Sequence, residues 1–455
     1  MATGQLLSGK EIQYKVSTIA IVALISSLLI DSLLSDISTI INQSLPEISR
    51  IALFTALFAV AGLSGSQAVI YESKKIKNEL GFKNYALALA SRIVPLIQYA
   101  IIGLLGLLTL QIIFGSQYLT VSYVALIAAS WTTGALLMAA MSFKFIQWYR
   151  TKRNRLVLLY LVSSLMFCVI LGASIVPQSL ITLETTPIVN ANSSEVKPFQ
   201  ANPQILDTLF AIISIANWLV IPLALIIWAA TAVVLRGYSK KYGVGKYWLM
   251  ISAPLASLII ASVSVLILLP TLSSIFDENA IPYAMLAFGG ILTEGFLLGF
   301  AFIITSRTYQ RITGSRTKIN YYLDISARGV VILFVSFFAN PSAGSYLPFG
   351  VIAASFFAFG AYLFFTGIYS SAISVSGDMN LRKSIRKSAM DQSKLLGSIG
   401  TSQMKLELQK RVLSIAKSQQ DNMLQETGVQ PSLSEHDMKE YLDEVISEIK
   451  TTRSK

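Results

Sequence analysis

Uncharged, strongly apolar stretches of about 20 residues recur along the first 375 positions of the chain. A helix of that length crosses about 30 Å of hydrocarbon, and backbone groups in lipid are satisfied only within helices or closed barrels. Only 13% of the residues are charged, whereas a soluble domain carries about 25%. The sequence therefore predicts an all-α, polytopic integral membrane helix bundle of ten spans: 16–36, 51–70, 86–114, 119–147, 156–177, 206–235, 247–270, 281–305, 323–339 and 349–374.

The positive charges fall almost entirely on one side of these spans. Of the 36 Lys and Arg residues, only Arg50 and Lys197 lie in the opposite loops, and only Arg92 and Arg328 lie within spans. Because cytoplasmic loops carry the excess of Lys and Arg, we expect a multi-pass plasma-membrane protein with both termini in the cytoplasm. The same rule explains the net charge of +12, which therefore does not indicate nucleic-acid binding.

The longest outer loop, 178–205, holds three prolines and is predicted to lack regular structure. Asn42 and Asn192 begin N-x-[ST] triplets that face outward. The sequence leaves open whether either asparagine is glycosylated.

The chain divides into a helix bundle, 1–375, and a mixed-charge cytoplasmic tail, 376–455. The tail begins with a basic segment that is expected to contact anionic lipid headgroups, at about 1 kcal/mol per basic residue: Arg382, Lys383, Arg386 and Lys387. Apolar side chains then keep to one helix face over 404–423 and again over 434–450. We expect these two helices to pack on each other, on the inner loops, on a second copy or on a protein partner.

Charged side chains inside spans are costly and suggest function by default. Glu294 lies in the middle of the eighth span and could pair with Arg92 or bind a proton or a cation. Asp324 and Arg328 are four residues apart and share a helix face. The alternative is that Arg92, Asp324 and Arg328 extend to the nearby cytoplasmic surface, as Asp31 could reach the outer surface.

Small and aromatic residues in the spans have ordinary structural interpretations. Gly295 and Gly299 are expected to let a neighbouring helix approach closely. Trp148 and Trp248 stand at the inner ends of spans, where we expect them to lie at the membrane interface.

The sequence lacks the residues that several classes of functional site require. The chain has one Cys, Cys168, and one His, His436, so it can form no disulfide within itself and offers no zinc, haem or copper site. It also has no G-x-x-x-x-G-K-[ST] motif for a nucleotide-driven motor. We therefore predict no catalytic residue, no cofactor and no metal, although an integral-membrane enzyme stays a remote alternative.

The segments 369–376, 381–387 and 426–435 resemble a group of uncharacterised membrane proteins from ammonia-oxidising archaea. The membrane part of that group is similar to the polytopic modules of some archaeal sensor proteins. The resemblance implies a membrane location and a sensory architecture, and it assigns no catalytic residue.

Three functions remain open at this point. The first is a membrane sensor or signalling scaffold, suggested by a last span that runs into a basic segment and an amphipathic helix. The second is a secondary transporter or channel that uses Glu294 and Arg92. The third is a structural subunit of a larger membrane complex.

Overall fold

A computed structural model of the chain describes residues 2–38, 41, 44–80, 85–185, 188–190, 203–272, 287–314, 317–339, 347–378 and 391–427. Within these residues nine helices are long and apolar enough to cross a membrane. The described part of the chain is therefore a multi-pass helical bundle, as its apolar stretches predict.

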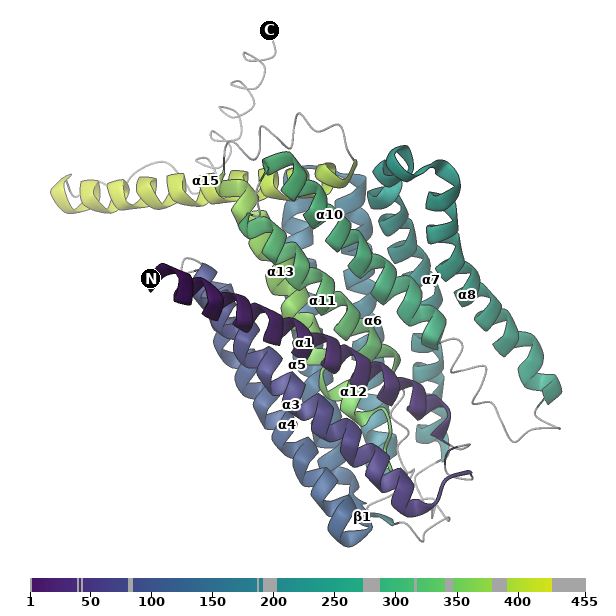
Figure 1. The fold of residues 1–455 in the computed structure, drawn as a ribbon. Coiled ribbons are helices and arrows are strands. Elements are labelled where there is room, and N and C mark those ends of the chain that lie inside the picture. Colours follow the sequence, from purple (N-terminus) through teal and green to yellow (C-terminus); the bar gives the residue numbers. More distant parts are fainter. Residues whose placement is uncertain are drawn as a thin grey trace.

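Helices account for nearly all of the described chain (Figure 1). Their bounds are α1 (Ala2–Asp36), α3 (Glu47–Leu80), α4 (Tyr85–Gly115), α5 (Thr120–Thr151), α6 (Arg155–Thr185), α7 (Pro203–Tyr242), α8 (Val244–Leu272), η2 (Ile291–Phe296), α10 (Leu297–Thr313), α11 (Lys318–Phe338), α12 (Val351–Ser355), α13 (Phe357–Gly377) and α15 (Asp391–Thr427). Two short strands, β1 (Gln117–Leu119) and β2 (Ile188–Asn190), form an antiparallel pair.

Each predicted span overlaps a helix in the described residues, and positions 281–286 of the eighth span lie outside them. The seventh corresponds to α8, whose apolar part, Val244–Ile260, is shorter than the nine long spans in the described residues. A crossing by α8 therefore stays a prediction.

Helix α6 and strand β2 correct the expectation for the loop 178–205. Residues 178–185 continue α6, and Tyr118 of β1 faces Val189 of β2. Ser179 and Thr182 donate side-chain hydrogen bonds to the carbonyls of Ile175 and Gln178 within the continued helix. Asn42 and Asn192 lie outside the described residues.

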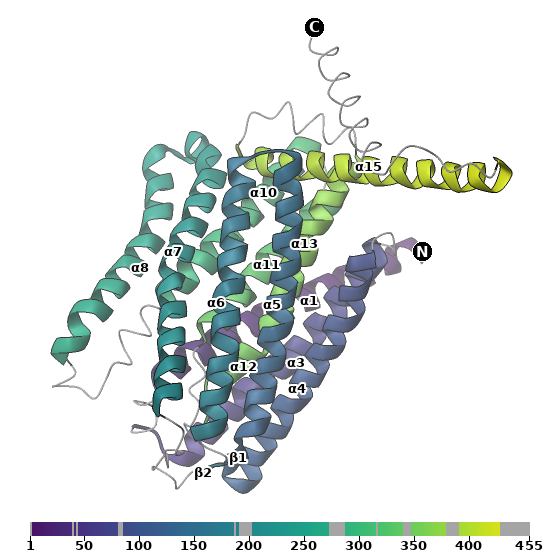
Figure 2. The ribbon, with the colours of Figure 1, turned by 180° about the vertical axis from the view of Figure 1, so that it is seen from behind.

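Helices α11 and α13 form the centre of the bundle. In α13, 89% of the most apolar stretch is buried, against 33% in α3 and in α4. Figures 1 and 2 show α1, α3 and α4 on one side of this pair and α7 and α8 on the other. The two central backbones meet at glycine, because a Cβ atom at Gly360 would lie 2.5 Å from the backbone nitrogen of Leu333.

The last predicted span, 349–374, is a broken helix rather than a continuous one. Helix α12 ends at Ser355, and Phe356 has φ −96° and ψ 5° before α13 begins. Polar side chains from neighbouring helices satisfy the backbone at the break: Ser130 donates to the carbonyl of Ala354 at 2.8 Å, and Gln98 donates to that of Ser355 at 3.1 Å. Irregular backbone at membrane depth is tolerated where protein satisfies it in this way.

Helix α15 lies across one end of the bundle, against α5, α6 and α13 (Figures 1 and 2). The connections α5–α6 and α7–α8 turn at the same end, and the β1–β2 pair lies at the opposite end. The first part of α15 packs on the bundle, and the rest projects past it (Figure 1). The predicted helix 404–423 is therefore confirmed, and it begins earlier, at Asp391.

Candidate functional site

An intramembrane ion pair joins α3 to α11. The guanidinium of Arg328 donates to Oε1 of Glu72 at 2.8 Å, and the hydroxyl of Tyr321 donates to Oε2 at 2.8 Å. Lys75 places its Nζ 3.6 Å from the ring centroid of Tyr321. The Glu72 side chain is fully buried, and that of Arg328 is 20% exposed.

Glu72 is the residue that the sequence reasoning missed. The predicted second span ends at residue 70, so Glu72 falls among the basic residues of a loop, whereas α3 in fact continues to Leu80. A signal was present, because Glu72 directly precedes Ser73-Lys74-Lys75 and is the only acidic residue between Arg50 and Lys77. Arg328 thus contacts a carboxylate on another helix, while Asp324, on its own helix, is half-buried.

Asp31 has a structural partner deep in the bundle. Its Oδ2 accepts the backbone N–H of Ala353 at 2.8 Å, and the residue is 0% exposed. Ala353 belongs to the first turn of α12, whose N–H groups have no partner within the helix. Asp31 of α1 therefore caps the broken helix, and the alternative of a side chain at the outer surface is wrong.

Glu294 lies in η2, a single π-helical segment, and is 0% exposed. Among the described residues, neither oxygen of its carboxyl group has a hydrogen-bond partner. Arg92 is exposed on α4. The predicted pairing of Glu294 with Arg92 is therefore wrong.

The glycines beside Glu294 bring η2 and α10 close to α11. A Cβ atom added at Gly295 would lie 3.2 Å from Cβ of Phe334, and one added at Gly299 would lie 2.9 Å from Cγ2 of Val331. Close helix packing, the expected role of these glycines, is confirmed.

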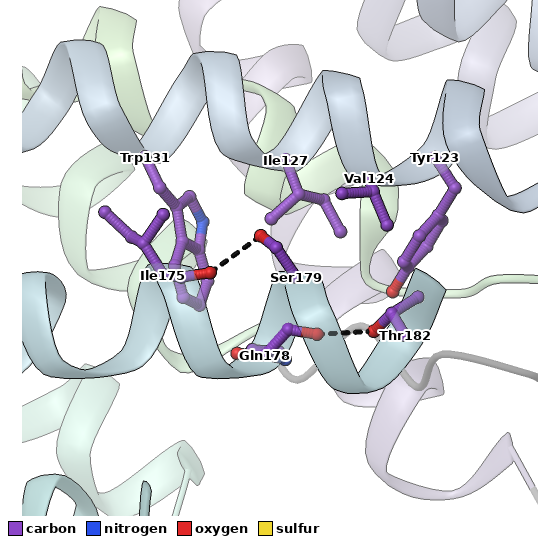
Figure 3. A pocket seen from close by; sticks show the side chains of 8 residues that line it. All are labelled: Tyr123, Val124, Ile127, Trp131, Ile175, Gln178, Ser179 and Thr182. Atoms are coloured by element: carbon purple, nitrogen blue, oxygen red, sulfur yellow. Dashed lines mark hydrogen bonds between the residues drawn. The ribbon is translucent and has the colours of Figure 1, made fainter. Parts of the chain in front are cut away.

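A small cavity lies between α5 and α6 (Figure 3). Its volume is about 10 Å³, which is about the space of one water molecule. Its lining is Tyr123, Val124, Ile127, Trp131, Ile175, Gln178, Ser179 and Thr182. It therefore offers no room for an organic substrate.

Metal-binding groups do not gather anywhere in the described part of the chain. No three His, Cys, Asp or Glu side chains come together there in a group that could hold a metal ion.

The junction between α15 and the bundle centres on Trp148, which is 0% exposed. Its Nε1 donates to Oε1 of Gln403 at 3.0 Å, and its carbonyl accepts the hydroxyl of Ser402 at 3.2 Å. Gly400 packs directly on Val375 of α13. Helix α15 thus covers Trp148, whereas Trp248 is 56% exposed. The position of both rings at the membrane interface stays a prediction.

The projecting part of α15 carries apolar side chains that the described residues leave exposed. Leu408, Val412 and Ile415 are 48%, 39% and 59% exposed. The basic segment of Arg382, Lys383, Arg386 and Lys387, and the second tail helix predicted over 434–450, lie outside the described residues.

No protein-family model matches the chain, and no curated protein or solved structure is significantly similar to it. The class of protein therefore follows from the fold alone, which is that of a multi-pass helical membrane protein. The resemblance to archaeal sensor modules stays a prediction.

Proposed function

We propose that this chain is a plasma-membrane signalling scaffold, in which the bundle holds α15 as an arm for a cytoplasmic protein partner. The observation that supports the proposal is the division of α15 into two parts. One part is packed on the ends of bundle helices through Trp148 and Val375, and the other projects with an apolar stripe. With both termini in the cytoplasm, this arm lies on the cytoplasmic side.

The apolar stripe of α15 consists of Leu408, Val412 and Ile415, at positions i, i+4 and i+7 of one helix face. The packed face, whose buried positions include Gly400 and Gln403, is centred about 170° away around the helix axis at 3.6 residues per turn. The packed face is turned toward the bundle and hence toward the membrane. The stripe is therefore turned away from lipid, which favours a protein partner that binds an amphipathic helix.

Helix α13 gives the bundle a route to the arm. It starts at the break after α12, the short helix whose first turn Asp31 caps, and it passes through the core and ends at Gly377 beside α15. Ser376, near that end, donates a hydrogen bond to Glu407 at 3.4 Å, and Val375 contacts Gly400. A shift of α13 along the core would therefore move α15.

The test is photo-crosslinking in cells from a benzoyl-phenylalanine placed at Leu408 or at Ile415. We expect adducts between this chain and one other protein from both positions. Lys417 is the matched control, because it is exposed on the same helix but stands on the side turned toward the membrane. Equal adducts from Lys417, or adducts with lipid alone from Leu408 and Ile415, would contradict the proposal.

A companion experiment separates the arm from the bundle. Changing Leu408, Val412 and Ile415 together to Ser is expected to abolish the partner adduct while the bundle keeps its thermal stability. The control variant changes Lys410, Ser414 and Lys417 to Ala and is expected to keep the partner. Retained partner binding by the first variant would contradict the role of the stripe.

A secondary transporter or channel is the second candidate, and Glu294 favours it. A buried, unpartnered carboxyl group in a π-helical segment, together with the broken α12–α13 helix, resembles the irregular helices at transporter binding sites. Glu294→Gln should then abolish ion-coupled uptake in reconstituted vesicles. Unchanged uptake of every substrate screened would remove this candidate.

A further inference from the structure

Among the described residues, Glu72 and Glu294 are completely buried within the spans, and their surroundings differ. Glu72 accepts hydrogen bonds from Arg328 and Tyr321, so its negative charge is compensated. Glu294 is equally buried, and in the described residues both of its oxygens lack a hydrogen-bond partner. Burial of an unpaired carboxylate is strongly unfavourable compared with burial of the neutral acid.

The helices packed against η2 are α7, α8, α10 and α11, and in the described residues none of their titratable side chains hydrogen-bonds to Glu294. Most of their titratable residues stand toward the helix ends in the sequence: Asp207, Arg236, Tyr238, Lys240, Lys241 and Tyr242 on α7; Lys246 and Tyr247 on α8; Arg307, Tyr309 and Arg311 on α10; and Lys318, Tyr321, Tyr322 and Asp324 on α11. Arg328 stands in the middle of α11, one turn before Val331, and its guanidinium donates to Glu72 of α3. At the level of η2, α11 instead presents Val331 and Phe334.

The local backbone is also unusual at Glu294. The N–H of Leu297 donates to the carbonyl of Leu292, five residues back, in place of the usual four. The Thr293 hydroxyl, beside Glu294, already donates to the carbonyl of Pro254 at 2.9 Å. A π-helical turn is less stable than an α-helical one and is frequently kept at functional sites.

We propose that Glu294 is an intramembrane proton-binding site whose carboxyl group carries an exchangeable proton. A metal cation would need several oxygen ligands, and the described residues contain no cluster that could supply them from acidic, His or Cys side chains. A lone carboxyl group in apolar surroundings binds a proton instead. The site does not depend on the signalling role of α15, because no residue of α15 belongs to it.

Infrared spectroscopy of the purified full-length protein in lipid tests the proposal. A protonated carboxyl group absorbs above the amide band, and we expect Glu294→Gln to remove one such band. Transfer to D₂O should shift that band in the wild type, because the proton exchanges. Glu72→Gln is the matched control, since a carboxylate paired with Arg328 contributes no such band.

If Glu294→Gln removes no carboxylic-acid band, or if the band that it removes never shifts in D₂O in the wild type, the proposal is overturned. If Glu294→Gln does not fold, labelling of the wild type with dicyclohexylcarbodiimide gives the answer instead. This apolar reagent modifies protonated carboxyl groups in membranes. Modification of Glu294 with Glu72 spared supports the proposal, and any other pattern counts against it.

Discussion

Asp31 and Glu72 show how single carboxyl groups hold separate parts of the bundle together. Asp31 of α1 binds the first turn of α12, and Glu72 of α3 binds Arg328 of α11. Both contacts join residues more than 200 positions apart. Each contact therefore holds together two helices that are far apart in the sequence.

Removal of the Asp31 carboxyl group is expected to destabilise the bundle. Asp31→Ala leaves the buried N–H of Ala353 without its partner, and a buried donor left unsatisfied costs about 1–3 kcal/mol. Asp31→Asn keeps an acceptor and should lose less. Equilibrium unfolding in detergent micelles measures both, and equal stability of Asp31→Ala and the wild type would contradict the capping role.

Removal of Arg328 alone is expected to lower the free energy of unfolding more than removal of Arg328 together with the Glu72 carboxylate. Arg328→Met strands the buried carboxylate of Glu72 and should lower the free energy of unfolding by about 3–5 kcal/mol. Adding Glu72→Gln should recover most of that loss. Arg92→Met, at an exposed position, is the control and should change stability by about 0.5 kcal/mol or less; additive losses at 72 and 328 would argue against the pair.

At the residue scale, the sequence indicated three of the buried or paired charges, but it missed Glu72 and identified none of their partners. Glu294, Asp31 and Arg328 stand out because charge inside an apolar stretch is rare. Their contacts depend on helices distant in the chain, such as the α3–α11 pairing of Glu72 with Arg328. A single sequence carries no signal for such pairing.

At the scale of whole elements, glycine determines how closely α11 and α13 approach. Gly360→Ala would place a methyl group 2.5 Å from the backbone nitrogen of Leu333, so the helices must separate, at about 1–3 kcal/mol. Gly103→Ala meets nothing within 4 Å and should be neutral or stabilising by up to about 1 kcal/mol. Thermal unfolding of the two variants provides the comparison, and equal effects would contradict the close crossing.

Helix positions were predictable because hydrophobic length alone specifies a membrane span. The break between α12 and α13 was not predictable, because side chains of other helices provide the hydrogen bonds that its backbone lacks. The carbonyls of Ala354 and Ser355 are satisfied by Ser130 and Gln98, which lie far away in the sequence. The extension of α6 to Thr185 was missed for a related reason, since Pro177 suggests an end that the helix passes through.

At the scale of the whole molecule, the packing of α15 on the bundle determines where the arm points. Gly400→Leu would force a side chain into Val375 and is expected to release α15. Trypsin should then cleave at Lys405 faster than in the wild type, while Ser418→Leu, at an exposed position, should leave the rate unchanged. Unaltered cleavage in Gly400→Leu would mean that α15 is not held at this junction.

The proposed role of α15 requires that the bundle spans the membrane with α15 on the cytoplasmic side. Labelling of single cysteines from each side of the membrane tests this orientation most directly. With Cys168 replaced by Ser, a new cysteine at Ser116 marks the β1–β2 end, and one at Ser418 marks α15; both positions are exposed. A membrane-impermeant maleimide should label position 116 only in right-side-out vesicles and position 418 only in inverted ones. Labelling of both positions from the same side would contradict a membrane-spanning bundle with a cytoplasmic arm.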